Sequence, residues 1–139
     1  MPSLRSKEEL LSFAERWLDA WTGNRPDRLM EFYSEEAFYS DPANRDGLRG
    51  KAAIREYFVR LLDVYPDWIW KPIEVFPTAG GMTLKWQCWI NVGGESVHEI
   101  GLDIVEITSG KISRNEVYFD RTRLAELVEA AKRRQRLIH

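Results

Sequence analysis

An aspartate lies in the middle of the most apolar β-like segment of this chain. Within residues 100–107, Asp103 stands between Leu102 and Ile104. A carboxylate in such surroundings is unfavourable unless water, a partner or a proton relieves it. Burial raises the pKa of a carboxyl group, and proteins obtain acids and bases that work near neutral pH in this way. Asp103 is therefore a candidate for a polar group inside a cavity.

Two further polar residues are candidates for the same site. Asp41 closes an extended segment and precedes Pro42, and it is a candidate site residue mainly through the family resemblance described below. Aspartate before proline is also common in turns, and the alternative is a residue that holds the following loop. Asn115 shares strand parity with Val117 and Phe119, which makes it a candidate hydrogen-bond donor in the cavity. A polar residue at the rim is the alternative for Asn115.

Aromatic side chains are numerous, with six Trp, five Tyr and six Phe. They suit both hydrophobic cores and ligand cavities, because Trp and Tyr combine a large apolar surface with a polar tip. The candidate ligand-binding aromatics are Trp17, Tyr33, Tyr57, Trp86 and Phe119. A plain aromatic core is the alternative for this set.

The composition limits the function classes. At 139 residues the chain is expected to form one domain over residues 1–139, with a C-terminal helix and tail at 123–139. The net charge of −2 favours neither nucleic acid nor an acidic membrane surface as a partner. One cysteine and two histidines predict no disulfide framework and no metal site. The N-terminus lacks a secretory apolar core and no membrane-spanning run follows, so a soluble cytoplasmic protein is expected.

The N-terminal part of the chain has helical spacing. Ser6 and Glu9 form a capping box that opens a first helix, and Gly23 ends it. Pro26 begins a second, short helix that is expected to extend through Tyr33. The polar segment 43–50 is expected to be a loop.

The rest of the chain predicts an α+β plan. A third helix begins near Lys51 and ends at Pro66. Strands are expected at residues 68–76, 82–92, 97–107 and 112–119, and a final helix at 123–136. Pro72 indicates that the first of these strands is an edge strand or contains a bulge. Helices followed by an antiparallel meander are typical of an α+β fold, and a strongly curved sheet on these helices would form a cone with a cavity at its mouth.

Alternation does not settle which face Asp103 occupies. In the strand at 82–92 the even-numbered residues are apolar, so they are expected to face the core. The next strand is apolar on both faces in its middle, which suggests that a second subunit covers the outer face. The pattern alone places Asp103 on the more polar face. His98 has the opposite parity and is expected to point outward.

The chain resembles the nuclear transport factor 2-like superfamily, and within it the SnoaL-like and ketosteroid-isomerase-like branch. The resemblance covers residues 6–120 and rests on the order of the elements and on three segments. These are Tyr39-Ser40-Asp41-Pro42, residues 50–58, and the pairing of Gly101-Leu102-Asp103-Ile104 with Gly110-Lys111-Ile112. It implies a cone-shaped, curved antiparallel sheet packed on three N-terminal helices, plus a C-terminal helix. It also implies a homodimer through the outer face of the sheet.

The resemblance assigns roles to particular residues. Asp41 looks like the general base of ketosteroid isomerase, and Asp103 looks like the protonated aspartate of its oxyanion hole. The tyrosine of the first helix, which supplies the other oxyanion donor in that family, is replaced by Trp17. This departure favours another acid–base reaction over steroid isomerisation. Limonene epoxide hydrolase shares the fold, but its strand motif would need arginine at Gly101.

Together these features predict a small-molecule-binding protein with an apolar ligand. The first hypothesis is an acid–base enzyme of the isomerase, dehydratase or cyclase type that acts on an apolar carbonyl compound without a metal or organic cofactor. Asp41 would abstract a proton and Asp103 would stabilise the enolate. The alternatives are a non-catalytic binder of an apolar metabolite and a dimeric association domain with an incidental cavity. Trp89 would anchor the dimer on the outer sheet face.

Overall fold

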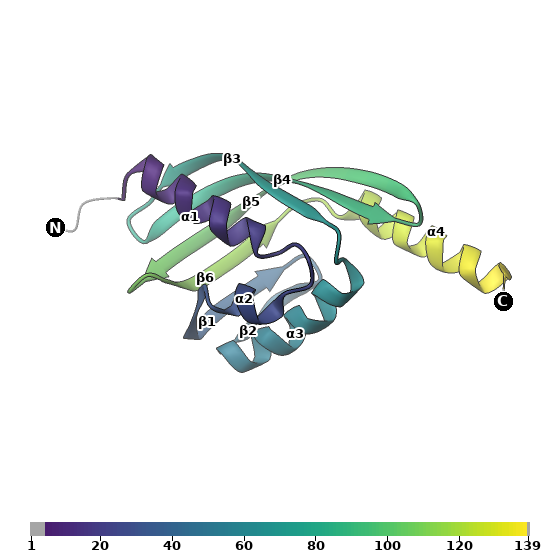
Figure 1. Cartoon of the computed structure of the whole chain (residues 1–139), viewed down its shortest axis with the longest axis horizontal. Helices are drawn as coiled ribbons and strands as arrows, with labels where there is room; N and C mark the ends of the chain where they lie inside the picture. Colours follow the sequence, from purple (N-terminus) through teal and green to yellow (C-terminus); the bar gives the residue numbers. More distant parts are fainter. Residues whose placement is uncertain (1–4, 139) are drawn as a thin grey trace.

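The computed structural model describes residues 5–138 as helices packed on one curved sheet (Figure 1). In chain order the elements are α1 (Lys7–Asp19), α2 (Pro26–Met30), β1 (Tyr33–Asp41), β2 (Asn44–Arg49), α3 (Lys51–Val64), β3 (Ile69–Pro77), β4 (Gly81–Val92), β5 (Glu95–Thr108), β6 (Lys111–Tyr118) and α4 (Thr122–Ile138). Residues 1–4 and His139 of the expected domain lie outside the described residues.

The expected start of the first helix is confirmed. The Ser6 side chain accepts a hydrogen bond from the Glu9 backbone N–H at 3.1 Å, which satisfies one of the free donors of the helix end. The buried stripe of α1 consists of Leu10, Ala14, Trp17 and Leu18. This stripe packs α1 across the inner face of the sheet, mainly over β3.

The α+β fold with a curved, unclosed sheet is confirmed. The strand order is β2-β1-β6-β5-β4-β3, so β2 and β3 form the two edges. Four of the five strand pairs are antiparallel, but β1 and β6 run parallel, and the sheet is therefore mixed rather than purely antiparallel. The parallel pair forms because the meander β3–β6 brings its last strand back beside the first strand of the chain.

Two local expectations are wrong. The segment expected as a loop at 43–50 contains strand β2, which forms a hairpin with β1. The second helix ends at Met30, and Tyr33 starts β1 instead of continuing the helix. Tyr33 lies opposite Ile112 in the parallel pair, so tertiary pairing overrides the local helical spacing.

The expectation for Pro72 is confirmed on both counts. Strand β3 is an edge strand, and its pairing with β4 shifts register between Pro72 and Glu74. The shift bends β3 at a point where proline cannot donate a ladder hydrogen bond.

The inner face of the sheet carries the even-numbered residues of β4 and the odd-numbered residues of β5. The first assignment is as expected from alternation. The second corrects the alternation-based prediction, because Asp103 faces inward with only 4% of its surface exposed. Ile100 and Leu102 lie on the outer face and are 50% and 44% exposed, so exposed apolar residues caused the wrong assignment. His98 is exposed, as expected.

The helices cover different parts of the sheet. Helix α1 packs on β3 and β4, α3 packs on β1 and β2, and α4 starts beyond β6 and packs near the end of β4 (Figure 1). No helix among residues 5–138 is long and apolar enough to cross a membrane.

Candidate functional site

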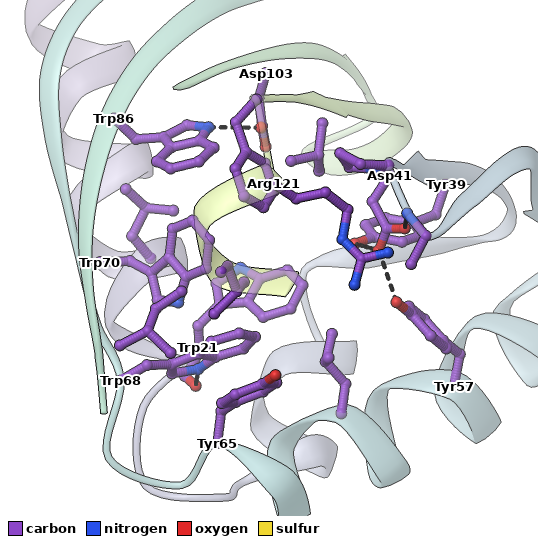
Figure 2. Close-up of a pocket in the computed structure, with 18 residues that line it drawn as sticks. Trp21, Tyr39, Asp41, Tyr57, Tyr65, Trp68, Trp70, Trp86, Asp103 and Arg121 are labelled. Atoms are coloured by element: carbon purple, nitrogen blue, oxygen red, sulfur yellow. Dashed lines mark hydrogen bonds between the residues drawn. The ribbon is translucent and has the colours of Figure 1, made fainter. Parts of the chain in front are cut away.

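A cavity of about 120 Å³ lies between the inner face of the sheet and helices α1 and α3. Eight of its 18 lining residues are aromatic: Trp21, Tyr39, Tyr57, Tyr65, Trp68, Trp70, Trp86 and Phe119. Figure 2 shows how the labelled rings surround the cavity. Some of these rings pack edge to face, as in the Trp70–Trp86 pair with ring centroids 4.7 Å apart, whereas Tyr65 stacks on Trp68. The charged residues of the wall are Asp41, Asp103 and Arg121.

Asp103 is the buried carboxyl group of this cavity. Its Oδ1 accepts a hydrogen bond from Trp86 Nε1 at 2.7 Å, and its Oδ2 accepts one from Asn115 Nδ2 at 2.9 Å. Burial raises the pKa of Asp103 to about 7, although the two hydrogen bonds lower it and the nearby Asp41 adds a smaller rise. Asp103 can therefore both accept and donate a proton near neutral pH.

A chain of hydrogen bonds fixes the carboxyl from behind. Asn115 Oδ1 accepts from the Tyr33 hydroxyl at 2.9 Å, and the Tyr33 oxygen accepts from Trp17 Nε1 at 3.3 Å. All three side chains are fully buried. Because the Asn115 oxygen is occupied by a hydroxyl donor, its amide nitrogen is directed at Asp103. The chain links α1, β1, β6 and β5.

Asp41 is surrounded by donors. Its Oδ1 accepts from the backbone N–H groups of Ala43 and Asn44 at 2.9 and 2.8 Å. Its Oδ2 accepts from the hydroxyls of Tyr39 and Tyr57 at 2.7 and 2.8 Å. A carboxylate has about four acceptor positions, so the acceptor capacity of Asp41 is used within the protein. Asp41 holds the β1–β2 turn and ties α3 to β1.

The two tyrosines beside Asp41 remain protonated at neutral pH. Burial and the negative charge of Asp41 both raise the pKa of Tyr39 and of Tyr57. Each hydroxyl donates its hydrogen bond to Asp41, so Tyr57 can only accept hydrogen bonds from a cavity ligand.

Comparison with known families and proteins identifies the family of the chain. A family model for the SnoaL-like domain matches residues 14–115, which include Asp41 and Asp103. The chain belongs to the SnoaL-like family. A steroid Delta-isomerase from Nocardioides simplex is 36% identical over 53 residues, which span 38% of this chain and 43% of that protein. The chain therefore matches less than half the length of this relative.

Solved structures share the fold of this SnoaL-like domain. A protein from Jannaschia sp. CCS1 named as a SnoaL-like polyketide cyclase superposes with a TM-score of 0.75 at 12% identity, covering 93% of this chain and 99% of that chain. TerC, co-crystallized with polyporic acid, superposes with a TM-score of 0.72 at 14% identity, covering 85% and 95%. At these identities the likeness shows the fold alone.

The residues expected in the site fall into two groups in the structure, one that lines the cavity and one that lies behind Asp103. Asp41, Asp103, Tyr57, Trp86 and Phe119 line the cavity. The other three expected residues do not line it: Trp17, Tyr33 and Asn115. They form the buried chain behind Asp103 because their polar atoms point at one another.

Several wall residues were not expected from the sequence. Arg121 is not among the candidates taken from the sequence, but its side chain lies at the cavity (Figure 2). Trp21, Trp68 and Trp70 also line the wall, and the high tryptophan content was the only signal for them. Tyr39 shares strand parity with Asp41, and this parity could have identified it. No group of three or more metal-ligating side chains is found within residues 5–138.

Proposed function

We propose that this SnoaL-like protein is a cofactor-independent acid–base catalyst that acts on an apolar carbonyl compound, with Asp103 as the proton-transfer residue. The observation that carries the proposal is the Asp103 carboxyl, which is buried in an aromatic cavity and has a pKa raised to about 7. Such a group has an accessible acid and an accessible base form under the same conditions.

The chemistry follows from these two forms. The Asp103 carboxylate takes a proton from the carbon next to a carbonyl, and the resulting carboxylic acid returns a proton to another atom of the enolate. A positioned acid–base group contributes about 10²- to 10⁴-fold to such a rate. Trp86 and Asn115 lower the free energy of the carboxylate form, so that Asp103 can ionise inside an apolar site. The aromatic wall holds the apolar body of the substrate.

Asp41 receives a different role from the one that the family resemblance implies. Four donors already occupy its oxygens, and a base must have a free lone pair directed at the substrate. We assign Asp41 as a positioning residue that keeps Tyr57 in the cavity wall.

The names of related proteins support the reaction class. Steroid isomerisation and polyketide cyclisation both involve enolates of apolar carbonyl compounds, and both names occur among the proteins similar to this chain. The polyporic acid bound to TerC is compatible with a cavity rich in aromatic side chains.

Proton exchange tests the proposal without knowledge of the product. Acetophenone, propiophenone and 2-tetralone are incubated with the protein in D₂O, and NMR follows deuterium entering the carbon next to the carbonyl. We expect exchange above background with at least one ketone, with a rate that rises as the pH passes through about 7 and Asp103 ionises. Asp103→Asn should lower the rate by at least about 100-fold.

The controls separate proton transfer from folding. Asp41→Asn should reduce exchange less than Asp103→Asn, because Asp41 acts through Tyr57. Circular dichroism confirms that each variant is folded. An Asp103→Asn rate equal to that of the wild type would rule out Asp103 as the proton-transfer residue.

A non-catalytic binder of an apolar metabolite is the second candidate. The saturation of Asp41 favours it, because the cavity then contains one available carboxyl group instead of the pair that ketosteroid isomerase uses. Saturable ketone binding in calorimetry, combined with exchange at the background rate for all three ketones, would select this candidate.

A further inference from the structure

Arg121 is fixed at the cavity by the start of α4. Its backbone carbonyl accepts a hydrogen bond from Ala125 N at 2.8 Å. The neighbouring Asp120 caps α4 by accepting from the backbone N–H and the hydroxyl of Thr122 at 3.0 and 2.6 Å. The helix therefore holds the backbone of Arg121. The Arg121 side chain extends over the cavity toward Asp41 and Tyr57 (Figure 2).

The guanidinium group has unused hydrogen-bonding capacity. Within residues 5–138, the Arg121 side chain has no hydrogen bond or ion pair with another residue. Asp41 lies nearby, but its two oxygens already accept two hydrogen bonds each. Five N–H donors of a permanent cation are thus available at the edge of an apolar cavity.

A second free donor lies at the same side of the cavity. The Tyr65 ring stacks on Trp68 with centroids 4.9 Å apart, and its hydroxyl has no hydrogen-bond partner among the described residues. Burial raises the pKa of Tyr65, so this hydroxyl keeps its proton at neutral pH. The positive charge of Arg121 is close enough to lower this pKa by a smaller amount. A ligand group that meets both residues must supply acceptor oxygens and, for the cation, a negative charge.

We infer that Arg121 is the specificity-determining residue of the cavity and that it binds a carboxylate on the ligand. The inference rests on the proposed function and narrows its substrate class to an apolar carbonyl compound that carries an acidic group. The carbonyl end would lie at Asp103 and the carboxylate at Arg121, with the aromatic wall around the body between them. A planar guanidinium matches the two oxygens of a carboxylate, whereas an amide of the same shape offers one oxygen and no charge.

Matched ligand pairs test this inference. Aryl methyl ketones built on benzene, naphthalene and biphenyl are each prepared with a carboxylate and with a primary amide at the far end. Calorimetry gives the dissociation constant of each compound at pH 7.5 for the wild type, Arg121→Gln and Arg121→Lys. Arg45→Gln is the matched control, because Arg45 lines the neighbouring surface groove with Arg121 but does not line the cavity.

We expect wild type to bind at least one carboxylate ten or more times more tightly than its amide. Arg121→Gln should reduce this preference to less than about twofold, and Arg45→Gln should retain it. Arg121→Lys should give an intermediate preference, because lysine keeps the charge but cannot pair with both carboxylate oxygens. The preference should also weaken in 0.5 M NaCl, because Arg121 is exposed to solvent. Equal preference in wild type and Arg121→Gln overturns the inference. The absence of saturable carboxylate binding to the wild type also overturns it.

The Asp103→Asn variant separates the two proposals. If it loses proton exchange and keeps the carboxylate preference, both proposals stand. If exchange does not depend on Asp103 but the preference disappears in Arg121→Gln, the proposed reaction fails and the carboxylate site remains. If exchange depends on Asp103 and the preference is absent, the inference about Arg121 fails alone.

Discussion

At the residue scale, two opposing effects of the surroundings determine the pKa of Asp103. The surrounding aromatic rings remove water and favour the protonated acid, while Trp86 and Asn115 donate hydrogen bonds that favour the carboxylate. Burial is the larger effect, and the pKa of Asp103 therefore rises from its usual value of 3.8 to about 7. The same balance makes the group useful in chemistry and unfavourable for stability.

The unfavourable part predicts how stability depends on pH. Between pH 4 and 7 the folded protein keeps the Asp103 proton that the unfolded chain has lost, so the contribution of Asp103 to the free energy of unfolding falls as the pH rises. The full loss above pH 7 is on the order of 4 kcal/mol. Asp103→Asn has no such proton. In urea unfolding, we therefore expect the free energy of unfolding of Asp103→Asn to rise relative to that of the wild type between pH 4 and pH 8.

An Asp46→Asn variant controls for the loss of one exposed carboxyl group. A stability difference between wild type and Asp103→Asn that is constant over this pH range would contradict the raised pKa of Asp103.

Residue chemistry was only partly predictable from the sequence. A carboxyl between Leu102 and Ile104 is visible in the sequence, and so is the Asp-Pro turn at Asp41. The donors to Asp41 were not predictable, because they come from a hydrogen-bonded turn and from the hydroxyl of Tyr57, 16 residues away. Arg121 was missed because its approach to the cavity depends on where α4 starts.

At the element scale, β4 and β5 fit together through one glycine. Gly101 lies opposite Trp86 in the antiparallel register, and a Cβ added to it would meet the Trp86 ring and the Tyr118 carbonyl oxygen, the latter at 2.7 Å. The glycine therefore makes room for the indole that donates to Asp103. This also explains why arginine, expected here in an epoxide hydrolase, is incompatible with Trp86 in its present position.

Gly101→Ala should therefore damage both packing and the site. We expect a loss of about 1–3 kcal/mol in the free energy of unfolding, because neither the ring nor the backbone oxygen can move without disturbing the sheet. Thermal or urea unfolding measures this loss. Gly80→Ala is the matched control, since its nearest neighbour is the Glu106 carboxylate oxygen at 2.8 Å, which is the end of a flexible side chain. Equal losses in the two variants would contradict the packing argument.

The elements were more predictable than their pairing. Capping at Ser6, the edge position of β3 and the inner face of β4 follow from local signals, and the structure confirms them. Strand β2 was missed because it is a polar strand without alternation. The parallel β1–β6 pair was missed because it depends on contacts between segments distant in sequence.

At the scale of the whole molecule, the outer face of the sheet carries an exposed apolar surface. Ile69, Ile100, Leu102 and Tyr118 are all exposed there, and Trp89 lies beside Ile69 and stacks on His98 with centroids 5.1 Å apart. Single exposed apolar residues are ordinary, but a group of them on one sheet face is typical of an interaction surface. We propose that two copies of the chain associate through this face.

Trp89→Glu should disrupt the association, because it places a charge on this surface between Ile69 and His98. Light scattering coupled to size exclusion should give the mass of a dimer for the wild type and of a monomer for Trp89→Glu. Val64→Glu replaces an exposed apolar residue at the end of α3, away from the sheet, and should remain dimeric. A monomeric wild type, or a dimeric Trp89→Glu variant, would exclude this face.

The aromatic wall also has an optical consequence. Four of the six tryptophans, Trp21, Trp68, Trp70 and Trp86, surround the cavity, while Trp17 is buried behind Asp103 and Trp89 lies on the outer face. Most of the intrinsic fluorophores therefore report on one small volume, and the Trp86 indole is hydrogen-bonded to the group that titrates there. Tryptophan fluorescence should therefore respond both to a ligand in the cavity and to protonation of Asp103. The emission spectrum can guide a search for ligands before any reaction is known.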